Sequence, residues 1–209
     1  MMSQTNTAPI LLKRLDEIAV IRFIRPEIKN PLSIATLESL KSIFAELESN
    51  NHVIKIIFTG SGDTFASGAN LNEIAETSAD NARAFALRGQ NLMQAIYRSK
   101  KLTIAAIDGF CMGGALDLAL SCKLRIASAN SIYAHPGANL GIMTGWSGTQ
   151  ILPRLIGEAK ALELFLTAQR VDAKEALRIG LIDKITLNPL ADALKTTKHN
   201  AFTKSETSK

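Results

Sequence analysis

Two glycine-rich turns are the segments of this chain best suited to stabilising negative charge. The sequences FASGAN at 65–70 and CMGGAL at 111–116 each follow a β-rich run and precede a helix. Turns of this kind expose backbone N–H groups at a helix N-terminus, where the helix dipole also favours negative charge. One such turn can simply allow close packing. Two that converge could form an oxyanion hole, in which each contributes one N–H to polarise a carbonyl group.

A carboxylate and a histidine follow the second turn in the sequence. Asp117 is in the first turns of the helix after CMGGAL, between Leu116 and Leu118. An acid there complements the helix dipole, but its apolar neighbours also predict a raised pKa, as proton-transfer groups often have. His135 stands near the end of a short β-rich run, where a structural role explains it as well as a chemical one does.

The elements that must position these residues alternate between strand and helix. Strands are expected at 10–12, 18–23, 53–60, 102–109, 124–128, 131–135 and 181–186. Helices are expected at 34–48 behind an N-cap at Ser33, from near 71, at 81–99, directly after CMGGAL, and at 149–156, 159–167, 173–179 and 189–197. This alternation favours an α/β fold with crossover connections, and only the C-terminal tail is expected to have little structure.

Length and composition narrow the class of protein. The 209 residues fit one domain, and 46% hydrophobic with 21% charged residues excludes a disordered chain, a collagen-like repeat and a disulfide-rich miniprotein. No stretch approaches the roughly 20 apolar residues of a membrane span, and the N-terminus shows no secretory signal. Cys111 and Cys122 are too few for a disulfide framework. They are expected to be reduced thiols that pack as small apolar side chains in a cytoplasmic protein.

The charge distribution argues against a nucleic-acid surface. The formal net charge is +5, and residues 195–209 hold four lysines against one glutamate, so the rest of the chain is only weakly basic. No basic stripe is interleaved with the few aromatic residues. Neither GxGxxG nor GxxxxGK[ST] occurs, so neither glycine turn fits a dinucleotide fingerprint or a P-loop.

Four longer segments, taken in order and spacing, resemble the crotonase (enoyl-CoA hydratase/isomerase) superfamily. They are IIFTGSGDTFASGANLNEI, IAAIDGFCMGGALDLALSCKLRIAS, HPGANLGIMTGWSGTQILPRLIG and KEALRIGLIDKI. The resemblance runs from about Leu11 to Ile185. It implies a crotonase-like α/β fold, a spiral of β-β-α units with approximately perpendicular sheets. It also implies a core domain over 1–188, followed at 189–209 by a short helix and a basic polar tail in place of most of the usual C-terminal helical region.

The resemblance also implies a ligand and the residues that hold it. The family's two oxyanion-hole amides fall on Ala69 and Gly114, which would hold the thioester carbonyl of an acyl-CoA. Arg25 and Lys29 would lie near the CoA phosphates, although both can also be explained as solvated loop charges. Further substrate contacts are assigned to Ser67, Asn70, Leu71, His135, Gly137 and Trp146. No metal and no cofactor beyond the substrate's own CoA are implied, and the expected assembly is a homotrimer or a dimer of trimers.

The acid/base positions depart from the family pattern. Hydratases of the family use two glutamates, which fall here on Asp117 and Gly137. The Asp117 stem is one methylene shorter, on the order of 1.5 Å, and misplacement by about 1 Å can cost 10²-fold in rate. Gly137 has no side chain, so His135, a water molecule or a small anion such as bicarbonate is left to fill its space. Trp146 is either wall and core or a residue that stacks on the acyl group.

Two functions therefore stand side by side. The first is an enzyme that acts on an acyl-CoA thioester, with Asp117 as the remaining acid/base and hydration of a 2-enoyl-CoA as the family's usual reaction. The second is a non-catalytic acyl-CoA-binding member that lost the second carboxylate. Nucleic-acid binding through the basic tail is the weakest hypothesis.

Overall fold

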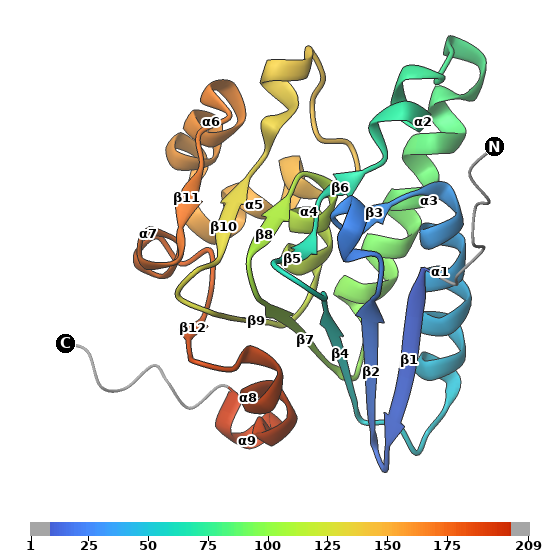
Figure 1. Cartoon of the computed structure of the whole chain (residues 1–209), viewed down its shortest axis with the longest axis vertical. Coiled ribbons are helices and arrows are strands. Elements are labelled where there is room, and N and C mark those ends of the chain that lie inside the picture. Colours follow the sequence, from blue (N-terminus) through green and yellow to red (C-terminus); the bar gives the residue numbers. More distant parts are fainter. Residues whose placement is uncertain (1–8, 202–209) are drawn as a thin grey trace.

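A computed structural model describes residues 9–201 and shows an α/β fold (Figure 1). The strands are β1 (Ile10–Leu15), β2 (Ile18–Phe23), β3 (Pro31–Leu32), β4 (Lys55–Thr59), β5 (Thr64–Ala66), β6 (Gly68–Ala69), β7 (Leu102–Ile107), β8 (Phe110–Met112), β9 (Leu124–Ala127), β10 (Ile132–Ala134), β11 (Val171–Asp172) and β12 (Lys184–Ile185). The helices are α1 (Ile34–Ser49), α2 (Leu71–Ala75), α3 (Ala79–Arg98), α4 (Gly114–Ser121), α5 (Gly148–Ile156), α6 (Glu158–Thr167), α7 (Ala173–Arg178), α8 (Pro189–Lys195) and α9 (Lys198–Ala201). Two 3₁₀ turns, η1 and η2, cover Pro26–Ile28 and Pro136–Leu140.

The sheets follow the β-β-α repeat that the resemblance predicted. The large sheet has the order β1-β2-β4-β7-β9-β12, and its strands are parallel except for the β1–β2 hairpin. After each of β4, β7 and β9, the chain adds a strand to the small sheet, whose order is β11-β10-β8-β5, and then turns into helix. β3 and β6 pair separately. The predicted crotonase-like α/β class is confirmed.

Local signals in the sequence explain the element boundaries. Asp16 adopts a left-handed φ of 49° in the two-residue turn that pairs Leu15 with Ile18. The predicted N-cap of α1 is confirmed, because the Ser33 hydroxyl accepts a hydrogen bond from the Thr36 amide at 3.2 Å. β3 and β6 were not predicted from the sequence, since two-residue strands are too short to show a period.

The apolar core occupies both faces of the large sheet. On one face, Phe23 and Phe65 meet edge to face at 5.7 Å between ring centroids, in a buried cluster that includes side chains of α1 and α3. Cys111 and Cys122 are buried in this core, as predicted. A second cluster, in which Ile57 and Ile104 are fully buried, packs against α8 on the other face.

A buried lysine ties α8 to the sheet. The Nζ atom of Lys55 on β4 donates to the carbonyls of Ala193, Leu194 and Thr196 at 3.1, 2.7 and 2.7 Å. Cations favour the C-terminal end of a helix, where carbonyl groups lack partners. Burial lowers the pKa of Lys55.

The C-terminal end differs in part from expectation. The helix predicted at 189–197 is α8, and α9 forms a further turn in a region expected to have little structure. Proline at the first position of α8 and the Asn188 cap explain where that helix begins. The lysines at 204 and 209 lie outside the described residues, and the domain boundary at 188 stays a prediction.

Candidate active site

The two glycine-rich turns meet in space. A Cβ atom placed on Gly68 of β6 would lie 2.6 Å from the Met112 carbonyl oxygen and 3.0 Å from the Gly114 amide nitrogen. The FASGAN and CMGGAL segments are therefore in backbone contact, and a side chain at 68 would force them apart. Ala69 and Gly114 consequently line one common cavity.

The backbone at the start of α4 presents the Gly114 amide. Gly113 has φ 52° and ψ −122°, a conformation that side chains rarely adopt, and its N–H donates to the Ala134 carbonyl at 2.9 Å. Gly114 is the first residue of α4, so its N–H has no acceptor within the helix. A backbone N–H that is free in this way can donate to a bound carbonyl oxygen.

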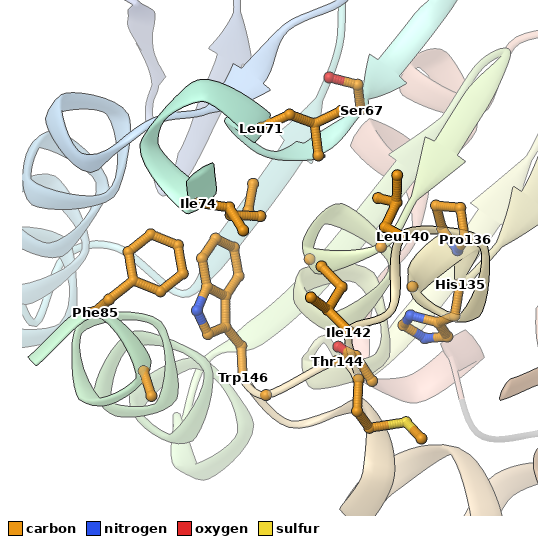
Figure 2. A pocket seen from close by; sticks show the side chains of 17 residues that line it. Ser67, Leu71, Ile74, Phe85, His135, Pro136, Leu140, Ile142, Thr144 and Trp146 are labelled. Carbon is orange, nitrogen blue, oxygen red and sulfur yellow. The ribbon is translucent and has the colours of Figure 1, made fainter. Parts of the chain in front are cut away.

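The cavity has a volume of about 270 Å³ and a mainly apolar wall (Figure 2). Trp146 and Phe85 lie on one side of the view, and His135 and Pro136 lie on the other. The lining residues are Ser67, Ala69, Leu71, Ile74, Phe85, Ala86, Gly113, Gly114, His135, Pro136, Gly137, Leu140, Ile142, Met143, Thr144, Gly145 and Trp146.

Asp117 lies behind this wall. Its side chain is fully buried, and its Oδ2 atom accepts a hydrogen bond from the Thr144 hydroxyl at 2.5 Å. Its Oδ1 atom is 3.5 Å from His135 Nε2. Burial raises the pKa of Asp117, while His135, Thr144 and the nearby backbone of Ser147 and Gly148 partly oppose the rise. The carboxyl group does not line the cavity itself.

His135 stands between Asp117 and the cavity. The imidazole is 3% exposed, lines the cavity and packs against Phe165 with 5.2 Å between ring centroids. Burial lowers the pKa of His135, and Asp117 opposes this shift. Among the described residues, neither imidazole nitrogen of His135 has a hydrogen-bond partner, and none donates a hydrogen bond to Asp117 Oδ1. Of the two residues, only His135 lines the cavity, so its imidazole is the polar group of this pair that would stand next to a bound ligand.

A side chain at position 137 would force the surrounding turn to open. A Cβ atom on Gly137 would lie 2.5 Å from the Ile142 carbonyl oxygen. The turn is held in this form by the Ile142 amide, which donates to the Gly137 carbonyl at 3.0 Å. His135 is one of the groups expected to fill the space beside Gly137. Its side chain lies against Asp117.

Trp146 forms a wall that is also core. The indole is 4% exposed and packs against Phe85 with 5.9 Å between ring centroids. Cβ atoms on Gly89 of α3 and on Gly114 would each lie 2.3 Å from indole atoms. The ring therefore fills a slot that exists only because both positions are glycine.

Three predicted substrate contacts lie outside the cavity lining. Lys29 Nζ binds both carboxylate oxygens of Asp63 at 2.8 Å, and this pairing lowers the pKa of Asp63. Arg25 precedes η1, and its backbone N–H donates to the Asn30 side chain. Asn70 caps α2 by accepting from the Asn72 amide. The other two neighbours of the first turn, Ser67 and Leu71, do line the cavity.

Sequence reasoning missed Thr144 and Phe85. Thr144 is a single hydroxyl in a loop without periodicity, and only the fold brings it to Asp117. Phe85 belongs to the predicted helix at 81–99, but nothing in the pattern of that helix marks it as a cavity residue.

The described part of the chain shows neither a cluster of metal-binding side chains nor a membrane-spanning helix. Within residues 9–201, no three histidine, cysteine, aspartate or glutamate side chains gather closely enough to hold a metal ion. In the same part of the chain, no helix has the length and apolar character needed to cross a membrane.

The amino-acid sequence matches characterised relatives along most of its length. The sequence profile described as Enoyl-CoA hydratase/isomerase matches residues 13–204. The chain is 37% identical to the Short-chain-enoyl-CoA hydratase of Clostridium acetobutylicum and 39% identical to the Crotonyl-CoA hydratase of Syntrophomonas wolfei. Each alignment covers 84% of this chain and 68% of the relative.

Solved structures agree with the sequence matches. Pseudomonas aeruginosa DspI superposes with a TM-score of 0.85 at 33% identity, covering 92% of this chain and 74% of that one. An enoyl-CoA hydratase from Thermoplasma volcanium gives a TM-score of 0.86 at 31% identity, covering 92% and 77%.

Proposed function

Because the chain belongs to the enoyl-CoA hydratase/isomerase family, we propose that it adds water to the double bond of a short 2-enoyl-CoA thioester. The observation that carries this proposal is the convergence of Ala69 and Gly114 on one apolar cavity that also contains His135. The names of the two curated relatives, a short-chain-enoyl-CoA hydratase and a crotonyl-CoA hydratase, support the same substrate class.

The thioester carbonyl is held by the backbone amides of Ala69 and Gly114. When water adds to C3, negative charge develops on this carbonyl oxygen as an enolate. Each preorganised donor can be worth about 3–4 kcal/mol at the transition state. The apolar surroundings strengthen these interactions, since they lower the local dielectric constant.

Proton transfer is assigned to the His135–Asp117 pair. Neutral His135 accepts a proton from the attacking water, whose oxygen bonds to C3, and the resulting imidazolium returns the proton to C2. Because Nε2 faces Asp117, Nδ1 is the nitrogen that takes this proton. Asp117 acts as a positioning residue that stabilises the imidazolium, and Thr144 holds the carboxylate in place.

Substrate access to His135 requires a small movement. Both ring nitrogens are buried, so the imidazole must shift slightly to bring Nδ1 to the cavity while Nε2 stays on Asp117. Catalytic hydrogen bonds are often long in unliganded enzymes and tighten only in the complex. The 3.5 Å contact with Asp117 is of this kind.

The test is hydration of crotonyl-CoA, which is monitored as the loss of absorbance of its conjugated double bond. Wild-type protein should turn the substrate over, and Asp117→Asn should suppress turnover by about 10²-fold or more, within the range of general acid–base catalysis. Turnover that is unchanged in the variant would remove Asp117 from the mechanism.

A second function has its own structural support. The closed backbone at Gly137 leaves no room for a second carboxylate, as expected of a member that binds acyl-CoA without converting it. Calorimetric titration with butyryl-CoA, beside the crotonyl-CoA assay, separates the two functions. Binding without turnover of any enoyl-CoA would favour this second function.

The remaining properties follow from family membership as proposals. We propose that no cofactor is needed beyond the CoA of the substrate, and that the protein acts in the cytoplasm as a homotrimer or a dimer of trimers. Light scattering coupled to size exclusion measures the assembly, and a monomer at micromolar concentration would contradict it.

A further inference from the structure

Trp146 borders two cavities at once. Besides the substrate cavity, it lines a second cavity of about 640 Å³ between α3 and α5. Gly145 and Trp146 are the residues that both linings share. The second cavity has mixed walls that include Leu87, Met93, Tyr97 and Ile151. The indole is therefore a partition with open volume on either side.

The partition stands directly beside the proposed carbonyl site. The Gly114 amide is assigned to the thioester oxygen, and a Cβ atom on the same residue would lie 2.3 Å from Trp146 Cζ3. Phe85 and Trp146 lie together on one side of the cavity (Figure 2), so an acyl chain that runs from this carbonyl towards Phe85 lies against the indole. The ring fits in this position only because residues 89 and 114 are both glycine.

We propose that Trp146 sets the acyl-chain length by closing the substrate cavity against the second cavity. This inference rests on the proposed acyl-CoA function and adds to it the residue that limits the substrate. With the indole present, a longer chain that runs in this direction is stopped by the ring. With a smaller side chain, the two cavities join, and a longer chain continues between α3 and α5.

The experiment compares wild type with Trp146→Leu and Trp146→Phe on 2-enoyl-CoAs of four to twelve carbons. In wild type, kcat/KM should fall once the chain reaches the indole. In Trp146→Leu the optimum should move to longer chains, with a gain of up to about fourfold for each additional methylene that becomes buried. Trp146→Phe should give a smaller shift in the same direction.

Phe85→Leu is the matched control. Phe85 contacts Trp146 and lines the substrate cavity, but it is not part of the second cavity's lining. Loss of this aromatic ring widens the substrate cavity without opening the partition, so it should not extend the profile to the longest chains. Length profiles that run parallel for wild type and both Trp146 variants would overturn the proposal.

Calorimetric binding of saturated acyl-CoAs of the same lengths separates this proposal from the proposed hydration. A length limit that appears in wild-type binding and is lost in the Trp146 variants supports the partition even if no enoyl-CoA is converted. Equal affinities for short and long chains in wild type, or no binding at all, would overturn it. Thermal unfolding shows which variants are folded. If Trp146→Leu is unfolded, the result is decided by Trp146→Phe, which keeps an aromatic ring in the slot.

Discussion

Replacing Gly137 with the glutamate that the family resemblance implies for this position should damage the protein rather than improve it. The Cβ atom would start 2.5 Å from the Ile142 carbonyl oxygen, whereas ordinary contacts begin at 3.4 Å. The turn from Gly137 to Ile142 must therefore open by about 0.9 Å, against the hydrogen bond that closes it. Overpacking of this kind costs about 1–3 kcal/mol.

The matched comparison isolates this clash. Gly137→Ala adds only the Cβ atom, while Gly145→Ala adds the same atom in the same loop where nothing lies within 4 Å. For a chain of this size, 1–3 kcal/mol corresponds to a fall in Tm of roughly 2–12 °C. Scanning calorimetry should show this fall for Gly137→Ala and little change for Gly145→Ala.

Gly137→Glu should lose at least as much stability as Gly137→Ala and should gain no hydratase activity. The carboxylate would start from a displaced turn, and an error of about 1 Å in a catalytic group is enough to lose 10²-fold in rate. A Gly137→Glu protein as stable as wild type, with faster hydration of crotonyl-CoA, would refute this reasoning. It would mean that the loop accommodates a second carboxylate after all.

Three further predictions concern buried charge. Lys55→Met removes three charged hydrogen bonds to the end of α8 and should cost about 2 kcal/mol in the free energy of unfolding, measured with urea; an unchanged midpoint would contradict this. Burial raises the pKa of Asp117 above 3.8, so the folded state binds this proton more tightly and loses stability as pH rises through 3.8 towards the folded pKa. Asp117→Asn does not lose stability in this way, so its Tm relative to wild type should increase between pH 4 and 7. A Tm difference that stays constant over this range would contradict the prediction. Burial lowers the pKa of His135 below 6.5, so the acid limb of kcat/KM, where neutral His135 becomes protonated, should lie below pH 6.5 and not above it.

The elements with strong local signals could be predicted from the sequence. The Ser33 cap and the helix that it begins each depend on residues close together in the chain. The pairing of β3 with β6 depends instead on backbone contacts between segments far apart, which no local pattern encodes. The turn at Pro136–Leu140 likewise shows no period that could be recognised.

The site was predictable only in part, for a related reason. The two glycine turns were visible in the sequence, but their contact through Gly68 and Gly114 is a property of the fold. Asp117 is predicted from the sequence as an acid/base, but only the fold shows that its carboxyl group lies beside His135 and Thr144. The slot for Trp146 depends on Gly89, which is distant in the sequence and carries no signal of its own.

In the proposed mechanism, the His135–Asp117 pair adds water to an acyl-CoA held at the Ala69 and Gly114 amides. The most direct test is conversion of crotonyl-CoA in ¹⁸O-labelled water, with the product mass measured for wild type and His135→Gln. Wild type should incorporate one labelled oxygen into the acyl group, and His135→Gln should do so at least about 10²-fold more slowly. A wild-type protein that binds the thioester without incorporating oxygen, or a His135→Gln protein that matches it in rate, would contradict the claim.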